Sequence, residues 1–383
     1  MANNSEIHTL MQKNKDIHII KIKNIIPFFH KPLMKLKKIF AIALCALCFT
    51  ACSDDDDNSD KRIEGEYYGA FVLNQGNMRN NIPGSLTNID YETGTAYQNV
   101  YREVNGRVLG DTPQDAIIYG DRMYIAVYQS NVIEVVNKKT LKSEKTITLN
   151  STGTQPRDLA AKGDYVYISM YDGYVSRLDT KTLTRDKTVK VGPNPEEIAI
   201  AGDYLYVTNS DGMNYTNGYV NGKTVSKINL STFTEEKKIE VGLNPTKIKS
   251  NGSDIFVICM GNYGDVPAML KQIKNNDTVE DLFPATMMAI NGNQLYLVND
   301  PFYGTDTEYM LYTISSNTKK SLYFDNIAVP QGIGIEPSTG HIFISSLSAK
   351  SAYSEPFYVN EYTADGDFIT KYDAGVGATC FVF

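Results

Sequence analysis

Short apolar runs separated by Gly and Asp turns fill the chain from residue 66 to its end. The stretch 156–192 shows the pattern clearly, with runs at Asp158–Ala161, Tyr165–Met170, Tyr174–Leu178 and Thr188–Val191. Runs of this length that are rich in Tyr, Val, Ile and Thr predict four antiparallel β-strands. The apolar rhythm of 3.6 residues that a helical repeat would require is absent from the sequence.

The four-strand unit recurs along the chain, each time behind a proline. Copies begin at Pro113, Pro156, Pro195, Pro245, Pro284 and Pro330, at spacings of 39 to 50 residues. A period of about 40–50 residues with four strands per unit predicts the blades of a β-propeller.

The two ends of this region complete one more blade. Glu66–Asn74 matches the second strand of the unit, and Gly377–Phe383 matches a first strand with nothing after it. Pairing of these segments would close the ring and leave no free sheet edge. We therefore predict an all-β fold for residues 66–383. It is a seven-bladed β-propeller with four antiparallel strands per blade, one blade being shared between the N- and C-terminal segments.

The N-terminal part of the chain predicts export and anchoring. Residues 1–33 lack the blade pattern, and we interpret them as an over-called start, with Met34 as the initiator. Residues 34–51 have a basic start, an apolar stretch and small residues before Cys52, as in a signal peptide. The segment Phe49–Cys52 resembles the lipobox of bacterial lipoproteins, in which the cysteine is acylated. The alternative is an uncleaved anchor helix.

An acidic tether, residues 52–65, follows this cysteine. Its simplest interpretation is a solvated, disordered linker. We favour a surface-export signal, because acidic residues directly after a lipidated cysteine resemble those of lipoproteins displayed outside the outer membrane. We thus expect an outer-membrane protein that faces the cell exterior and contacts the membrane only through its lipid.

Charge excludes one class of partner. Without residues 1–51 the chain has 29 basic and 42 acidic residues, a net charge of −13. No basic stripe remains, so nucleic acid is not an expected partner. Cys259 and Cys380 lie in apolar runs and are predicted to be buried free thiols.

Strand order places the long loops on one face of the ring. Connections between second and third strands, and the links into each proline, share one face, which we call the loop face. The turns between first and second strands and between third and fourth strands share the other, the turn face. The enlarged loops fall on the loop face: Asn74–Gly84, Asn209–Gly222, Met260–Pro267, Asn299–Glu308 and Ser345–Pro356. Binding residues are expected in such loops, and neutral drift is the alternative.

Aromatic and amide side chains are frequent on this face. Rings beside amides suit a large neutral ligand that has flat apolar surface and polar edges. Packing of the rings onto the blades is the alternative, which we expect for about half of them. The predicted ligand-binding residues are Tyr128, Arg157, Tyr171, Asn209, Asn214, Tyr215, Tyr219, Asn262, Tyr263, Asn299, Phe302, Tyr303 and Tyr353.

Charged and polar residues follow several of the prolines, around the predicted channel mouth. They are Gln114, Asp115, Arg157, Asp158, Glu196, Glu197, Lys247 and Gln331. They could form ion pairs that order the loops, each worth little when exposed, or they could line a ligand rim.

Catalytic signatures are missing from the propeller region. His341 is its single histidine, so a histidine-rich metal centre or a Ser-His-Asp triad is not expected. No Walker loop, GxSxG or HExxH motif is present. Asp300, Asp306 and Glu308 could hold Ca²⁺, but their spacing fits no defined calcium-binding loop. We expect no enzyme activity, no metal and no cofactor.

The repeat, read from PEEIAIAGDYLYVTN at Pro195, resembles the YncE-like seven-bladed propellers. Phe71–Asn77, Val104–Arg107 and Leu109–Asp111 resemble a narrower group, the lipidated surface propellers of gut bacteria that include the BtuG-type cobalamin-capture proteins. This resemblance implies a surface protein that captures cobalamin (vitamin B12) or a related corrinoid. It also implies transfer of that ligand to a TonB-dependent outer-membrane transporter. Three alternatives stay open: a propeller that binds a glycan or a partner protein, a lactonase-like enzyme with a channel-mouth metal, and a purely structural surface-layer role.

Overall fold

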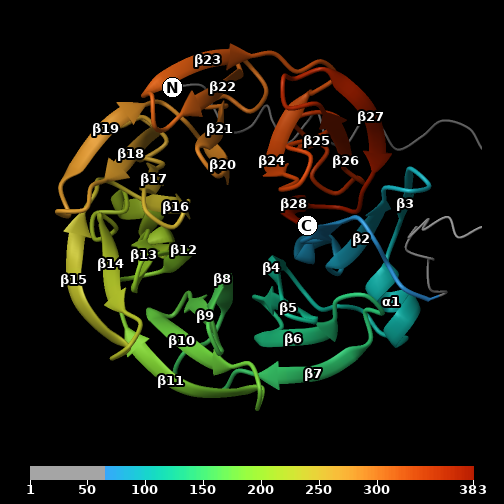
Figure 1. Cartoon of the computed structure of the whole chain (residues 1–383), viewed down its shortest axis with the longest axis horizontal. Helices are drawn as coiled ribbons and strands as arrows, with labels where there is room; N and C mark the ends of the chain where they lie inside the picture. Colours follow the sequence, from blue (N-terminus) through green and yellow to red (C-terminus); the bar gives the residue numbers. More distant parts are fainter. Residues whose placement is uncertain (1–64) are drawn as a thin grey trace, which may run out of the picture. The chain divides into compact units, whose positions relative to one another are not determined.

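Seven four-stranded antiparallel sheets stand in a ring in the computed structural model, which describes residues 65–383 (Figure 1). The predicted all-β, seven-bladed propeller is confirmed. The predicted start at 1–33, the signal peptide, the lipidation site Cys52 and the acidic tether up to residue 64 lie outside the described residues.

Six blades follow one another along the chain. Blade 1 consists of β4 (Pro113–Tyr119), β5 (Arg122–Val127), β6 (Val132–Asn137) and β7 (Ser143–Thr148), and blade 2 of β8 (Pro156–Lys162), β9 (Tyr165–Met170), β10 (Tyr174–Asp179) and β11 (Thr184–Lys190). Blade 3 consists of β12 (Pro195–Ala201), β13 (Tyr204–Asn209), β14 (Thr224–Asn229) and β15 (Thr234–Glu240), and blade 4 of β16 (Pro245–Ser250), β17 (Ile255–Cys259), β18 (Met269–Ile273) and β19 (Val279–Phe283). Blade 5 consists of β20 (Met287–Asn291), β21 (Gln294–Asn299), β22 (Glu308–Thr313) and β23 (Thr318–Leu322), and blade 6 of β24 (Val329–Ile335), β25 (Ile342–Leu347), β26 (Tyr358–Tyr362) and β27 (Phe368–Asp373).

The remaining blade is built from both ends of the described chain. Its strands are β28 (Ala378–Val382), β1 (Ala70–Asn74), β2 (Ser85–Asp90) and β3 (Thr95–Tyr97). β28 pairs antiparallel with β1, and Val72 lies opposite Phe381. The predicted closure is therefore confirmed, and β1 has a hydrogen-bonded partner on each side.

The first strand of every blade lies at the centre of the ring. These strands, β4, β8, β12, β16, β20, β24 and β28, contact their neighbours in sequence around the ring. The register shifts directly after the first proline of β4, β8, β12 and β16. A bulge of this kind re-aims the following side chains, and here those side chains border the channel.

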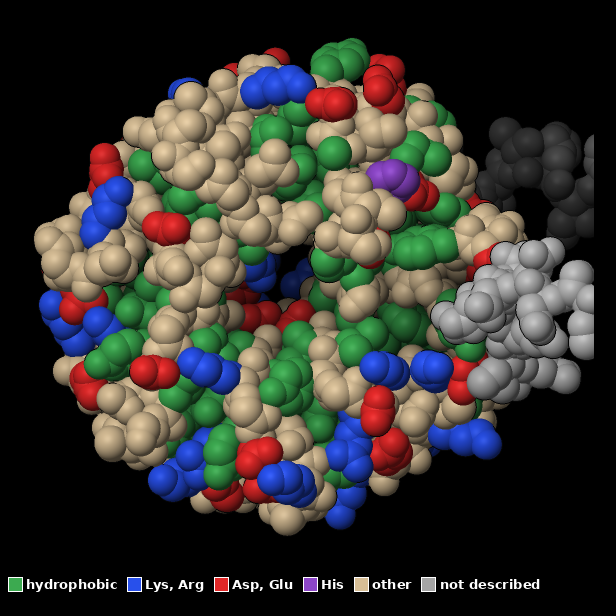
Figure 2. All heavy atoms as spheres, in the orientation of Figure 1, with side chains coloured by type: hydrophobic (Ala, Val, Ile, Leu, Met, Phe, Trp, Pro, Cys, Tyr) green, Lys and Arg blue, Asp and Glu red, His purple; other side chains and the backbone are tan. Residues whose placement is uncertain are grey.

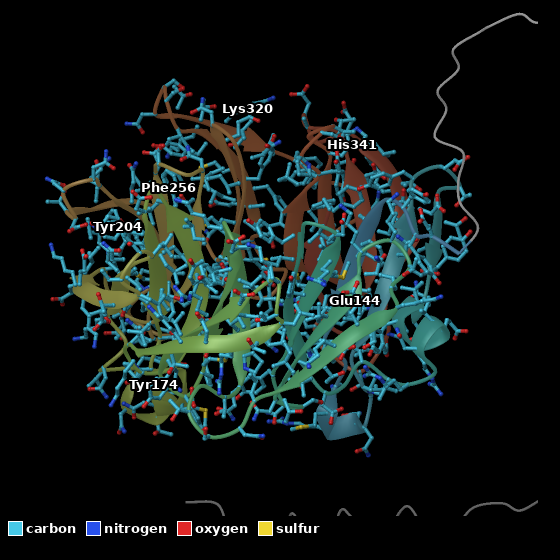
Figure 3. The ribbon with its side chains drawn as sticks, turned by 60° about the horizontal axis from the view of Figure 1, so that its bottom comes forward. Glu144, Tyr174, Tyr204, Phe256, Lys320 and His341 are labelled. Atoms are coloured by element: carbon cyan, nitrogen blue, oxygen red, sulfur yellow. The ribbon has the colours of Figure 1, made fainter. Side chains whose placement is uncertain are left out.

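Apolar side chains fill the spaces between blades; Phe256 of β17 and Tyr204 of β13, which are labelled in Figure 3, belong to two of these clusters. The middle strands are buried on both faces, as in β17, where all five residues are buried. The outer strands are polar; in β7 five of the six residues are exposed. This gradient from apolar middle strands to polar outer strands fits blades that pack face to face and meet solvent at their rims.

One short helix interrupts the blade pattern. α1 (Val100–Asn105) follows β3 and packs Val100 and Tyr101 into the apolar cluster between the shared blade and blade 1. Two 3₁₀ turns, η1 (Met78–Asn80) and η2 (Gly212–Asn217), lie in the loops β1–β2 and β13–β14. None of the helices in residues 65–383 has the length and apolar character needed to cross a membrane.

Candidate functional site

A channel runs between the first strands, and its cavity has a volume of about 760 Å³. Figure 2 shows a hollow at the centre of the ring, with acidic and basic side chains inside it. Residues of all seven blades border this cavity, because the first strand of every blade lies at the centre of the ring.

The channel wall has two unlike halves. One half, which we call the charged arc, comes from β4, β8, β12 and β16 and carries Asp115, Arg157, Asp158, Glu196, Glu197, Lys247 and Lys249. The other half, which we call the apolar arc, comes from β20, β24 and β28 and carries Met287, Met288, Ala289, Ile290, Ile333, Ile335 and Phe381, together with Phe383. This half also includes Thr286, Gln331, Thr379 and Cys380. A ligand that enters the channel therefore meets charged groups on one side and a mostly apolar wall on the other.

Three acids of the charged arc join neighbouring blades. Asp115 accepts a hydrogen bond from the Leu159 backbone N–H at 3.0 Å. One blade further on, Asp158 accepts from the Ile198 N–H at 2.7 Å. Glu197 repeats the contact with the Ile248 N–H of the next blade, at 3.1 Å. These buried backbone donors are thus satisfied across blade boundaries.

Two lysines hold the last of these acids in its charged form. Lys247 and Lys249 lie 3.0 and 2.9 Å from the two carboxylate oxygens of Glu197. Burial by itself favours the neutral acid, but the two ammonium groups outweigh it and lower the pKa of Glu197 to about 2.

The other two acids have raised pKa values. Burial raises the pKa of Asp115 and, together with the nearby Asp115 carboxylate, raises the pKa of Asp158 well above its ordinary value. Asp115 also accepts a hydrogen bond from the Cys380 thiol at 3.3 Å. Cys380 borders the channel and is half-buried, which corrects the prediction of full burial, whereas Cys259 is buried; both thiols are free.

Arg157 is held rigidly at the charged arc. Its guanidinium donates to Glu196 through Nε, at 2.8 Å, and through Nη2, and to Gln114 at 2.7 Å. The rings of Tyr128 and Tyr171 lie 5.3 and 4.9 Å from its carbon Cζ. Cation–π and ion-pair contacts together fix this side chain in one orientation.

The enlarged loops meet one another around one mouth of the ring. Asn77 of the β1–β2 loop donates to the Tyr353 carbonyl of the β25–β26 loop. Lys350 of that loop donates to the Phe302 carbonyl of the β21–β22 loop. The five enlarged loops named above all connect second and third strands, as predicted for the loop face.

The predicted aromatic residues of the enlarged loops differ in exposure. Tyr215, Tyr263, Phe302, Tyr303 and Tyr353 are exposed, between 45% and 65%. The ring of the half-buried Tyr219 lies 6.1 Å from that of Tyr263. Tyr263 also borders the cavity, so the exposed rings continue into the channel.

The predicted asparagines serve the loops themselves. Asn209 is fully buried, accepts from the Gly192 N–H and donates to Thr224 and Ser226, so it is not available to a ligand. Asn214, Asn262 and Asn299 donate to Asp211, Asp265 and Glu308. Their amides close turns, so these side chains order the loops.

Sequence reasoning missed part of the channel wall. Lys249 and the whole apolar arc were not among the predicted residues, although they lie in or next to the predicted first strands. Their place in the first strand of a blade was the available signal. A channel-facing apolar residue, however, has the same sequence pattern as one that packs between blades.

His341 and the acids of the β21–β22 loop show no sign of a metal centre. His341 lies on the turn face and pairs through Nδ1 with Glu361 at 2.7 Å. Asp300 uses Oδ1 to accept from the Gly304 N–H and the Thr307 hydroxyl. Within residues 65–383, no group of three or more His, Cys, Asp or Glu side chains is arranged to hold a metal ion.

Comparison with known proteins gives a family and a fold. Residues 68–373 match a family described as a domain of unknown function, DUF5074. Hydrazine synthase of Kuenenia stuttgartiensis has a similar structure, with a TM-score of 0.55 over 70% of this chain and 89% of that chain, at 14% sequence identity. At this identity the likeness shows the fold alone. No curated protein matches the chain.

Proposed function

This chain belongs to the DUF5074 family, whose description leaves the function open, and we propose that it is a cell-surface protein that binds cobalamin or a related corrinoid and passes it to a TonB-dependent outer-membrane transporter. A propeller that presents loops at one mouth of a rigid ring is compatible with surface binding. The ligand and the transporter come from the resemblance of the chain to the cobalamin-capture propellers.

One observation carries the proposal. The exposed rings of Tyr263, Phe302 and Tyr303 come from two successive enlarged loops of the loop face, and Tyr263 also borders the cavity. Exposed apolar side chains gathered on one face of a protein support a binding role for that face. A corrin macrocycle has two broad, partly apolar faces, which such rings can cover.

Side chains other than the predicted asparagines would bind the polar edge of the corrin. The corrin edge carries amides, and these need hydrogen-bond partners when a binding surface covers them. Tyr219, Tyr263 and Tyr303 carry hydroxyl groups on three of the enlarged loops. Gln114 and Gln331 border the cavity below. These side chains supply donors and acceptors beside the apolar contact.

Calorimetric titration of the purified protein with cyanocobalamin tests this proposal. We expect measurable heat with one binding site, and affinity that falls about tenfold or more in the Tyr263→Ala variant, since a central aromatic anchor carries much of a binding energy. Tyr323→Ala is the matched control, because Tyr323 is 79% exposed but lies outside the enlarged loops.

Absence of heat with cyanocobalamin, together with no retention on a corrinoid resin, would refute the proposal. Binding on a glycan array by the same protein would then favour the glycan alternative. Capture of a TonB-dependent transporter from outer membranes, in the presence of cyanocobalamin, tests the transfer step separately.

A further inference from the structure

One carboxylate oxygen in the channel lacks a partner. The charged arc contains eight carboxylate oxygens, from Asp115, Asp158, Glu196 and Glu197. Seven of them accept a hydrogen bond or an ion pair. Among residues 65–383, Oδ1 of Asp158 is the exception, since only Oδ2 of this residue accepts a bond, from Ile198.

This oxygen is open to the channel, since it is not among the fully buried oxygens without a partner. Asp158 is only 8% exposed and borders the cavity, so water reaches it only through the channel. A buried carboxylate needs a donor or a counter-charge. The charged groups that face Asp158 are Asp115 of β4, Glu197 of β12 and Lys249 of β16. Two of the three are acids, and Lys249 already donates to Glu197.

The charges of the arc also favour a cationic ligand. Four carboxylates face three cationic side chains, Arg157, Lys247 and Lys249. Arg157 is bonded to Glu196, and both lysines are bonded to Glu197. Burial and the Asp115 carboxylate raise the pKa of Asp158, and Lys249 opposes this shift only in part.

The opposite wall restricts what can supply that cation. Met287 and Ile290 of β20, Ile333 of β24 and Phe381 of β28, with the terminal Phe383, are only partly buried and border the cavity. The rings of Phe381 and Phe383 are stacked, with an interplanar angle of 11°. An inorganic cation would leave this hydrocarbon wall wet. A cation with an apolar body would cover it.

We propose that the channel is a binding site for an amphipathic amine, with its ammonium group donating to Oδ1 of Asp158 and its hydrocarbon part lying against Ile333, Phe381 and Phe383. The site lies inside the ring, below the exposed aromatic residues of the loop face. It is independent of the corrinoid proposal, and either can fail without the other.

Methyl NMR of the full protein, labelled with ¹³C at the methionine methyl groups, tests the site with n-hexylammonium chloride. Met287 and Met288 border the cavity, and their signals are assigned through Met287→Leu and Met288→Leu. We expect hexylammonium to shift these two signals with saturation. Hexanoate and hexan-1-ol, which have the same chain length without the positive charge, should leave them unmoved at equal concentration.

Asp158→Asn is the decisive variant, since asparagine can still accept from the Ile198 N–H through its carbonyl oxygen. Loss of the charged hydrogen bond should weaken hexylammonium binding about tenfold or more. Asp121→Asn is the matched control, because the Asp121 side chain is 95% exposed. Unchanged affinity in Asp158→Asn, or equal binding of hexanoate, overturns the proposal.

Phe383→Ala keeps the test decisive if Asp158→Asn does not fold. This substitution removes part of the apolar arc at the end of the chain. It should weaken hexylammonium binding several-fold and leave methylammonium binding unchanged, since methylammonium has no hydrocarbon tail to contact that wall. Equal weakening of both amines contradicts the predicted orientation.

Discussion

At the residue scale, the third position of the first strand decides how neighbouring blades are joined. Asp115, Asp158 and Glu197 each follow a proline by two positions and bond the backbone of the next blade. Lys247 occupies the same position in blade 4 and instead pairs back to Glu197. The run of acids therefore ends at a basic residue, and blade 4 alone supplies the Ile248 N–H and both lysines that hold Glu197.

Glu197→Gln should lower the free energy of unfolding by about 3 kcal/mol at pH 7, because it leaves Lys247 and Lys249 without their counter-charge. The pKa of Glu197 is lowered from 4.5 to about 2. Its contribution is therefore full above about pH 4.5 and is lost as the pH falls towards 2. Urea titrations at pH 7 and pH 2.5 measure the difference between wild type and variant.

The difference between wild type and Glu197→Gln should shrink at pH 2.5. Glu240→Gln serves as control, since Glu240 is exposed on β15, and its effect should be small at both values. A Glu197→Gln effect that is equally large at pH 2.5 would mean that packing, and not charge, explains it.

At the scale of elements, α1 takes the place of a longer outer strand where the shared blade meets blade 1. β3 has only three residues, and α1 follows it. The Tyr101 hydroxyl donates to Glu134, a fully buried acid, at 3.0 Å. Glu134 also accepts from Arg107 at 2.8 Å and from Thr146 at 2.6 Å. The helix is thus anchored by the Tyr101 hydroxyl inside an apolar cluster, and at its end by Asn105, which bonds Leu141 and Ser143.

Tyr101→Phe should lower the free energy of unfolding by about 1–2 kcal/mol, because it removes a hydrogen bond to a buried charged group and keeps the ring. Tyr97→Phe is the matched control, since Tyr97 is 41% exposed in β3, and it should have no measurable effect. Chemical denaturation checks both variants. Equal effects would show that the Tyr101 hydroxyl does not anchor α1.

At the scale of the whole molecule, closure of the ring depends on six residues at the end of the chain. β28 supplies the first strand of the shared blade and packs against β24, where Gly334 leaves room for Phe381. A Cβ at position 334 would lie 2.7 Å from that of Phe381, so the two inner strands touch. β28 therefore completes one sheet and also the contact with blade 6.

Deletion of residues 378–383 should lower the melting temperature strongly and produce oligomers, because β1 then has a free edge and the shared blade lacks its first strand. Deletion of Phe383 alone keeps β28 intact and should have a much smaller effect. Calorimetry and size-exclusion chromatography distinguish the two. A monomeric, fully stable deletion of 378–383 would contradict closure by β28.

The sequence pattern was enough to predict most of the fold, because blade repeats bring nearby residues together. Pairing partners such as Tyr165 and Asp179 lie within one unit, so turn residues and alternation predict their strands. α1 was missed, because six residues make fewer than two helical turns and show no clear period. The candidate site was predicted only in part, since an exposed aromatic residue and one that packs on the blades look the same in the sequence.

By itself, the sequence determined the number of blades, the shared closing blade and the face that carries the long loops. Each of these follows from the period and order of strands along the chain. The tertiary structure alone decided which side chains share the channel and what each of them bonds. Asp158, for example, meets Ile198 40 positions away and meets Asp115 and Lys249 from other blades. Partners at such separations depend on how the ring closes and how each bulge turns its side chain, and local pattern does not specify either.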